Sequence, residues 1–390
     1  MPQPAQRLAA VPPYLFAEID RKKREVVARG VDVISLGIGD PDLPTPRFVI
    51  DALHRAVENP ANHQYPDYEG SLAFRQAACQ FYARRFGQRF DPKTETLALI
   101  GSKEGLAHII WAFVDPGDVV LVPDPGYPVY GTHTRLAGGT PYLLPLRAEN
   151  GFLPDLSAVP EEVARRAKLL FLNYPNNPTG AVATVEFYQQ AVDFAGKHDI
   201  LIVSDNAYSE MTYDGYSAPS IFAAEGAREV AVEFWSLSKP FNMTGWRIGF
   251  VVGNAAAISA LGVIKTNTDS GQFTAVQEAA IAALTSPEAD AFIAQMNETY
   301  RRRRDLAVAG LRAIGLAASP MKGSFYLWVP VPKGHTSASF ATLLLEQAGV
   351  VVTPGSAYGE HGEGYIRISL CVSEERLQEA LERMRRFVTV

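Results

Sequence analysis

Four residues that could bind a phosphate group and attack a carbonyl lie close together after one apolar run. The segment VEFWSLSKPFNMTGWRIGF carries Ser236, Ser238, Lys239 and Arg247. A lysine amine is a nucleophile only when deprotonated, and burial or nearby positive charge lowers its pKa toward neutrality. Two hydroxyls and a guanidinium that converge on one point suit a phosphate, which arginine binds through paired hydrogen bonds. A solvated turn between a strand and a helix is the alternative interpretation.

A carboxylate and a phenol follow another apolar run, in ILIVSDNAYSE. Asp205 ends the run and would be costly to bury without a positive partner. Tyr208 comes three residues later and could lie on the same face of the following turn. A plain helix N-cap would also account for Asp205, and the spacing alone is weak evidence.

Three more apolar runs end in residues that could contact a ligand. In LALIGSKEGLAHIIWAF a strand leads directly into a helix, so the backbone N–H groups of Ser102 and Lys103 would face an anion, although simple capping is common there. Asn177 in FLNYPNNPTGAV offers an amide, or belongs to an ordinary turn. Tyr127 in PDPGYPVYG could stack on a flat ring, or merely pack.

The elements that position these residues alternate between helix-like and β-rich segments from about residue 47 to residue 285. This alternation predicts an α/β fold with a mostly parallel sheet between helices. The strand candidates are TLALIG, VVLVPD, KLLFLNYP, ILIVSD, VAVEFWS and RIGFVVG. Ligands of such sheets bind at the carboxyl ends of the strands, so we expect the residues named above to meet at one edge.

The rest of the chain predicts a second, smaller α+β domain. We expect an N-terminal arm at 1–12, a small domain formed by 13–46 and 288–390, and a large domain at 47–287. A long helix, TSPEADAFIAQMNETYRRRRDLAVAGLRAIG, begins the C-terminal part. Its run of four arginines, Arg301 to Arg304, is interpreted as a solvated face rather than a nucleic-acid contact.

Composition excludes several classes of protein. A hydrophobic content of 47%, a charged content of 20% and a net charge of −6 predict a globular protein without a nucleic-acid partner. No apolar stretch of about 18 residues offers a membrane span, and no secretory signal is evident. Cys79 and Cys371 do not suggest a disulfide framework, so we expect a cytoplasmic protein. Without G-x-G-x-x-G after a strand, G-x-S-x-G or H-E-x-x-H, we expect no nicotinamide, serine-hydrolase or metal chemistry.

The groups at successive strand ends are a lysine, a carboxylate, a phenol, an amide, an aromatic face and an anion clamp. Together they suit a pyridine ring that carries a phosphate, a phenolic oxygen and an aldehyde. That compound is pyridoxal phosphate. The motifs NNPTG, SDNAY and SLSKPFNMTGWRIG, in this order, resemble the class I and II aminotransferases, the fold type I enzymes of this cofactor. The resemblance extends from about Tyr14 to Ser369.

The resemblance implies a role for each matching residue. Lys239 would form the internal Schiff base, and Asp205 would pair with the pyridinium nitrogen. Tyr208 and Asn177 would bond the phenolic oxygen, and Tyr127 would stack on the ring. The residues that would hold the phosphate are Ser102, Lys103, Ser236, Ser238 and Arg247.

Three further residues extend this inference to the substrate and to a second subunit. Tyr65 in HQYPDYEG matches a tyrosine that reaches the phosphate of the neighbouring subunit, which implies a homodimer with shared sites. Arg367 in YIRISL would bind the substrate α-carboxylate, Gly39 of LGIGDPD would offer a backbone contact, and Asn177 would also contact the substrate. The freed Lys239 amine would then move the α-proton, so that no separate base is needed.

The segments LGIGDPDLPTP, IGSKEGLAH, VPDPGYPVY, NYPNNPTGAV and VVTPGSAYGE are most similar to the LL-diaminopimelate aminotransferases and their relatives. This similarity implies LL-diaminopimelate as donor, 2-oxoglutarate as acceptor and a place in lysine biosynthesis. It also implies a substrate contact from Tyr14 of PPYLF, which could equally be a helix staple. The candidates for a further substrate contact, in KTNTDSGQFTAVQ, are Asn267, Ser270 and Gln272.

Several alternatives stay open. The substrate could instead be aspartate, alanine or another general amino acid, and C–S lyases and decarboxylases share the same lysine and its surroundings. A regulator that uses the pocket for sensing would need an added DNA-binding domain, and only about 35 residues precede ISLGIGDPD.

Overall fold

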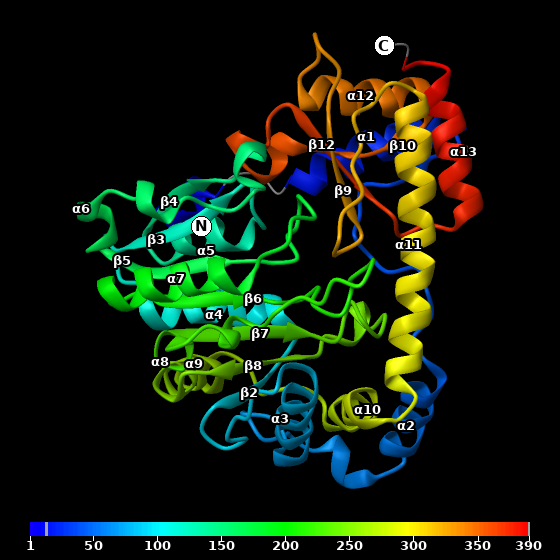
Figure 1. Cartoon of the computed structure of the whole chain (residues 1–390). Helices are drawn as coiled ribbons and strands as arrows, with labels where there is room; N and C mark the ends of the chain where they lie inside the picture. Colours follow the sequence, from blue (N-terminus) through cyan, green and yellow to red (C-terminus); the bar gives the residue numbers. More distant parts are fainter. Residues whose placement is uncertain (12–14, 389–390) are drawn as a thin grey trace.

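A seven-stranded sheet forms the centre of the computed structural model, which describes residues 1–11 and 15–388, without the side chains of residues 10 and 15–20 (Figure 1). Its strand order is β2-β8-β7-β6-β5-β3-β4. The strands from β7 to β4 run parallel, whereas β8 is antiparallel to both of its neighbours. The strands are β2 (Thr96–Leu99), β3 (Val119–Asp124), β4 (Thr140–Pro145), β5 (Ala167–Leu172), β6 (Leu201–Asp205), β7 (Ala231–Ser236) and β8 (Gly249–Gly253).

Helices cover both faces of this sheet, which explains why its strands read as continuous apolar runs. Successive residues of β3 show the arrangement: Leu121 packs into the core beneath α3 and α7, and Val120 and Val122 pack beneath α4 and α9. The helices of this part are α2 (Arg47–Val57), α3 (Leu72–Phe86), α4 (Ser102–Phe113), α5 (Val129–Leu136), α6 (Glu161–Ala164), α7 (Val185–His198), α8 (Ala227–Val230), α9 (Ala255–Thr268) and α10 (Thr274–Thr285). The predicted α/β fold is therefore confirmed.

One strand of the sheet was not predicted. β4 lies at the edge, pairs only with β3 and leaves several of its residues partly or fully exposed. Edge strands lack the uninterrupted apolar character of buried ones, and this strand also contains prolines at Pro141 and Pro145. Its sequence, TPYLLP, therefore gives a weak strand signal.

A second core joins the two ends of the chain. Ile34 and Leu36 pack with residues between 296 and 388, and with four residues of the segment that follows β6. This core underlies our proposal that 13–46 and 288–390 form one domain. Its elements are α1 (Leu15–Ala28), β1 (Ile34–Ser35), α11 (Ala289–Ala313), β9 (Tyr326–Pro330), α12 (Ser337–Ala348), β10 (Val350–Val351), β11 (Thr353–Pro354), β12 (Tyr365–Ser369) and α13 (Glu374–Arg385).

Two small sheets hold this second part together. Strand β1 pairs in parallel with β10, and β11, β12 and β9 form an antiparallel sheet. The long helix α11 runs along one side of the molecule, from the neighbourhood of α10 and α2 to that of α12 and α13 (Figure 1). It thereby spans the sheet-containing part and the second core.

The interpretation of the arginine run as a solvated face is wrong for two of its four members. Arg303 and Arg304 are buried, and their guanidinium groups lie 2.7 Å and 2.6 Å from carboxylate oxygens of Asp42 and Asp214. Helical periodicity places these two arginines on the inward face of α11. Their acidic partners offset the free-energy cost of burying the two positive charges. Arg301 stays on the surface beside Glu298.

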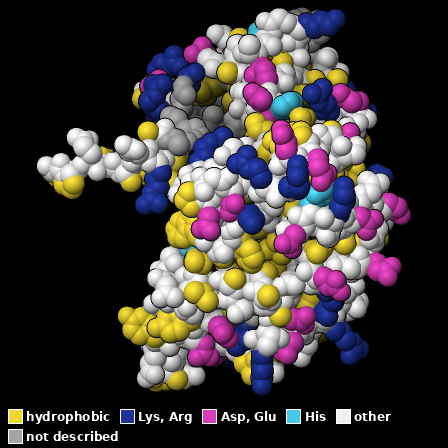
Figure 2. Space-filling model, turned by 90° about the vertical axis from the view of Figure 1, so that its left-hand side faces the viewer, with side chains coloured by type: hydrophobic (Ala, Val, Ile, Leu, Met, Phe, Trp, Pro, Cys, Tyr) yellow, Lys and Arg dark blue, Asp and Glu magenta, His cyan; other side chains and the backbone are white. Residues whose placement is uncertain are grey.

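The surface carries charges of both signs. On the face shown in Figure 2, acidic and basic side chains are interspersed, with apolar side chains between them. Among the described helices, none combines the length and the apolar composition needed to cross a membrane. Both cysteines are buried and unpaired.

Candidate active site

A cavity of about 450 Å³ lies at the carboxyl ends of the parallel strands. It brings together nearly all the residues that the sequence singled out, from segments more than a hundred residues apart. The predicted residues that line it are Gly39, Ser102, Lys103, Tyr127, Asn177, Asp205, Tyr208, Ser236, Ser238, Lys239, Arg247 and Arg367.

Asp205 is the last residue of β6, and its carboxylate is only partly satisfied. The phenol of Tyr130 donates a hydrogen bond of 2.6 Å to Oδ2. Oδ1 is buried without a hydrogen-bond partner among the described residues. Burial raises the pKa of Asp205 to about 6, against the opposing effects of the Tyr130 hydrogen bond and the Lys239 charge. The buried Oδ1 therefore has capacity for a further N–H donor, and a positively charged donor would favour the ionised form.

Lys239 follows β7 and points toward the second part of the chain. Its Nζ donates a hydrogen bond of 3.0 Å to the carbonyl oxygen of Gly39 and lies 5.5 Å from the ring centre of Phe325. Burial lowers the pKa of Lys239, and the positive charges of Arg367 and Arg247 lower it further. A lysine in these surroundings is more readily deprotonated than one on the surface, as a nucleophile requires.

An anion cradle forms where α4 begins. Gly101 precedes the helix with φ of +73°, and a Cβ atom there would lie 2.5 Å from Nη2 of Arg247. Glycine is thus needed for the guanidinium to approach the N-terminus of the helix. Burial and the charge of Arg247 lower the pKa of Lys103, which lies on the first turn. Backbone N–H groups and two cations at one helix start are suited to a phosphate.

Hydrogen bonds to Gln272 and Thr244 hold Arg247 in place. It adopts a left-handed conformation with φ of 55°, and Gln272 donates a hydrogen bond of 2.5 Å to its carbonyl oxygen. Its Nη1 donates to the carbonyl oxygen of Thr244 at 2.9 Å. Two serines also line the cavity, and the backbone N–H of Ser238 donates to the hydroxyl of Ser236 at 3.2 Å.

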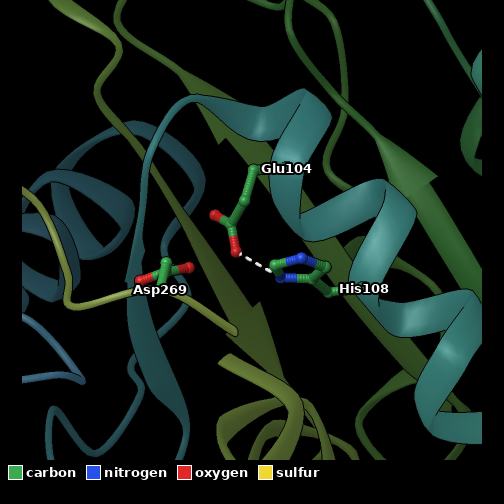
Figure 3. Close-up of side chains that lie close together, drawn as sticks. All are labelled: Glu104, His108 and Asp269. Carbon is green, nitrogen blue, oxygen red and sulfur yellow. Dashed lines mark ion pairs between the residues drawn. The ribbon is translucent and has the colours of Figure 1, made fainter. Parts of the chain in front are cut away.

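A charged cluster lies on α4 and the loop after α9 (Figure 3). The Glu104 carboxylate is 2.7 Å from Nδ1 of His108, and the Asp269 carboxylate approaches from the loop. These three groups could hold a metal ion, but the buried ammonium of Lys265 lies 3.1 Å from both oxygens of Asp269 and 3.6 Å from Glu104. Lys265 already supplies the positive charge, so we interpret the cluster as structural.

Arg367 on β12 is buried and lines the same cavity. Its Nη1 donates to Oδ1 of Asn177 at 2.8 Å, and its Nη2 donates to the carbonyl oxygen of Gly37 at 2.6 Å. Its guanidinium carbon lies 4.0 Å from the ring centre of Tyr326. These contacts fix the orientation of the guanidinium beside the cavity, as recognition of a carboxylate requires.

Some predicted residues do not meet in this cavity. Tyr65 is 88% exposed and does not line it, and Tyr14 lies outside the described residues. None of the three candidates after the lysine lines it either. Asn267 bonds the carbonyl oxygen of Val263, and Gln272 supports Arg247.

Sequence reasoning missed several lining residues: Ile38, Asp40, Asn173, Ala207, Thr244 and Tyr326. Asn173 ties two strand ends together, because its Nδ2 donates to the carbonyl oxygen of Asp205 and its Oδ1 accepts from the backbone N–H of Asn177. Its position directly after β5 matches that of the predicted residues and could have identified it. Tyr326 begins β9, far along the chain, where no local signal marks it.

Comparison with known proteins places the chain in a family. The family model described as "Aminotransferase class I and II" matches residues 31–384. The chain belongs to the class I and II aminotransferases. A curated "LL-diaminopimelate aminotransferase" of Moorella thermoacetica is 58% identical over 384 residues, which cover 98% of each chain. The predicted family, its fold and its aminotransferase activity are therefore confirmed.

Solved aminotransferase structures have the same fold as this one. The chain titled "Substrate bound BacF structure from Bacillus subtillis" is 38% identical, with a TM-score of 0.95, and the match covers 99% of this aminotransferase and 98% of that chain. A double mutant of Thermus thermophilus aspartate aminotransferase is 35% identical, with a TM-score of 0.93 and coverage of 99% and 100%. The fold therefore extends over nearly the whole of this aminotransferase.

Proposed function

We propose that this aminotransferase transfers an amino group from LL-diaminopimelate to 2-oxoglutarate, with pyridoxal phosphate attached to Lys239. The observation that carries the substrate assignment is the 58% identity, over nearly the full length of both chains, to the relative from Moorella thermoacetica. That relative is named for the same donor.

The residues around the cavity fit pyridoxal phosphate. The unpartnered Oδ1 of Asp205 would accept the N–H of a pyridinium ring, and the cradle at α4 would receive the phosphate. Between them, Lys239 has the lowered pKa of an amine that attacks an aldehyde. Once bound, the cofactor supplies an electron sink for the pair of electrons left on the substrate α-carbon.

The polar residues of the cavity would orient the ring and its phosphate. Asp205 would keep a proton on the ring nitrogen, and Tyr208 and Asn177 would bond the phenolic oxygen. Tyr127 would stack on the ring. Because all these residues come from strand ends of one rigid sheet, their relative positions are fixed before a ligand arrives. The phosphate would be held by Ser102, Lys103, Ser236, Ser238 and Arg247.

Lys239 and Arg367 would act on the substrate. Arg367 would bind the α-carboxylate, with backbone help from Gly39, and so would place the α-carbon close to Nζ of Lys239. The same Nζ would accept the α-proton, since the amine is held at the cavity by the Gly39 carbonyl at 3.0 Å. A second base is not needed, because one amine can take up and return the proton.

We also propose that two copies of the chain form a homodimer with shared sites. Tyr65 supports this proposal, because a tyrosine that is 88% exposed and outside its own cavity is free to reach the phosphate of another copy. The two buried, unpaired cysteines support a reducing, cytoplasmic location. The partners would thus be small amino and oxo acids and a second copy of the chain.

Aspartate, alanine or another general amino acid is the alternative donor. The structural similarity to an aspartate aminotransferase, with a TM-score of 0.93, favours this alternative. A C–S lyase would use the same lysine and would release a thiol, pyruvate and ammonia from a sulfur-containing amino acid.

The test is to incubate the purified enzyme with pyridoxal phosphate, 2-oxoglutarate and each candidate donor, and to measure glutamate formation. We expect the highest kcat/KM with LL-diaminopimelate. A higher value with aspartate or alanine would contradict the substrate assignment, and ammonia release without amino transfer would indicate elimination.

A further inference from the structure

A segment from the second part of the chain contacts the end of β3 beside the cavity. It comprises residues 355–362, which lie between β11 and β12. The backbone N–H of Gly126, two residues after β3, donates a hydrogen bond of 2.9 Å to the carbonyl oxygen of Tyr358. The next residue, Tyr127, lines the cavity, so this segment meets the sheet close to the proposed cofactor site.

A histidine of this segment contacts the carboxylate at the end of β3. Nδ1 of His361 lies 2.5 Å from Oδ2 of Asp124, and the backbone N–H of His361 donates to the same oxygen at 3.3 Å. Because a carboxylate only accepts hydrogen bonds, Nδ1 of His361 is the donor. Asp124 is only 1% exposed, so these donors replace the water that its carboxylate loses on burial.

The backbone of the segment also passes very close to Asp124. A Cβ atom at Gly359 would lie 1.4 Å from Oδ1 of Asp124, and this residue has φ of +135°. Glycine is needed here both for the backbone conformation and for the close approach. Both oxygens of the carboxylate therefore face the segment, Oδ1 beside Gly359 and Oδ2 beside His361.

The same segment supports the arginine proposed to bind the substrate. The Tyr358 ring is buried, and its centre lies 4.9 Å from the guanidinium carbon of Arg367. Tyr326 contacts the same guanidinium at 4.0 Å, so two aromatic rings help to fix its orientation. The position of Tyr358 depends in turn on how residues 355–362 are held at the end of β3.

We propose that His361 is a positioning residue, whose hydrogen bond to Asp124 holds residues 355–362 against β3 and so places Tyr358 against Arg367. This inference rests on the proposed function, because it takes Arg367 as the group that binds the α-carboxylate. The amino donor and the 2-oxo acceptor both present that carboxylate, so His361 supports the binding of both. The residues proposed to hold the cofactor within one chain all lie between 102 and 247, outside this segment, so cofactor binding does not depend on His361.

The kinetic test compares His361→Ala with the wild-type holoenzyme, using the amino donor on which the wild type is most active. Loss of one hydrogen bond corresponds to about threefold to tenfold in affinity, so the KM for the donor and the KM for 2-oxoglutarate should both rise by about this factor. We expect kcat to change by less than about twofold. His361→Asn, whose amide nitrogen can replace Nδ1 as the donor, should recover most of the wild-type KM.

His335→Ala is the matched control, since it removes an exposed histidine from the same part of the chain that does not line the cavity. It should change neither KM. The His361 side chain is 28% exposed, so its truncation leaves no buried cavity and the variant should fold. Unchanged KM values in His361→Ala would overturn the proposal, and so would a His361→Asn variant as impaired as His361→Ala. An equal loss of affinity for pyridoxal phosphate, measured by absorbance titration, would also overturn it, because it would show a general loosening of the fold.

A binding measurement separates this inference from the proposed function. Glutarate has both carboxylates of 2-oxoglutarate but no oxo group, so it binds without reacting. Its Kd for the holoenzyme, measured by calorimetry, should rise about threefold to tenfold in His361→Ala and further in Arg367→Ala. A wild-type Kd in Arg367→Ala would refute the proposed role of Arg367 and the inference with it. A raised Kd in Arg367→Ala with a wild-type Kd in His361→Ala would overturn the role of His361 alone.

Discussion

The phenol oxygen of Tyr208 lies 3.3 Å from that of Tyr326, and the Tyr326 ring lies beneath the guanidinium of Arg367. One tyrosine from the second part of the chain thus contacts both a residue proposed to bind the cofactor and the residue proposed to bind the substrate carboxylate. A Cβ at Gly39 would overlap the Tyr326 hydroxyl, so Tyr326 also packs against the Gly39 backbone. The carbonyl oxygen of Gly39 accepts the hydrogen bond from Lys239.

Two substitutions at Tyr326 should separate the contribution of its ring from that of its hydroxyl. Tyr326→Phe keeps the ring under Arg367, so the KM for the amino donor should change by less than about twofold. Tyr326→Leu removes a buried cation–π contact that is worth up to about 2 kcal/mol, and should raise this KM about tenfold. Equal KM values in the two variants, measured by steady-state kinetics, would contradict an orienting role for the ring.

Replacement of Lys239 by alanine should abolish turnover, because both the attachment point and the proton carrier are lost. The absorbance change that follows addition of the amino donor should disappear as well. Absorbance spectroscopy and a glutamate assay check this together, and near-normal rates in the variant would refute the assignment of Lys239.

Asp205→Asn should lower kcat by about 100-fold or more, because an amide cannot hold the ring nitrogen in its protonated form as a carboxylate does. Binding of the cofactor should persist, since Lys239 and the cradle are intact. Stopped-flow measurement of the half-reaction gives the rate. A loss smaller than tenfold would show that another group is the partner of the ring nitrogen.

The free energy of unfolding of the cofactor-free protein should depend on pH because of Asp205. Its pKa in the folded chain is raised to about 6 from 3.8, so the folded state binds this proton at a higher pH than the unfolded state does. The free energy of unfolding should therefore rise as the pH falls from 7 toward 4, by up to about 3 kcal/mol from this group. Urea unfolding of the wild type and of Asp205→Asn measures the effect, and parallel pH profiles for the two would contradict it.

The buried arginines of α11 should matter more for stability than their exposed neighbours. Arg303→Ala would leave Asp42 without its partner and should lower the free energy of unfolding by about 3 kcal/mol. Arg301→Ala, which removes an exposed arginine beside Glu298, should change it by less than about 1 kcal/mol. Similar losses in both variants would contradict the prediction that the buried ion pair contributes more to stability than the exposed one.

Much of this site could be predicted because its residues follow apolar strands that end at one edge of a sheet. Asp205, Lys239 and Asn177 each have this local signature. Tyr326 does not, because its importance arises from contacts such as that with Tyr208, which is 118 residues away in the sequence. The inward turn of Arg303 was missed for the same reason, since its partner Asp42 is 261 residues away.

The segment after β6 has a consequence for any attempt to divide the molecule. It begins at Asp205 on the sheet, but Tyr208, Met211 and Tyr213 pack into the second core. A fragment truncated before α11 would expose these three side chains to water and would release Tyr208 from Tyr326. A chimera that takes its substrate specificity from a relative should therefore exchange this segment and the C-terminal part together.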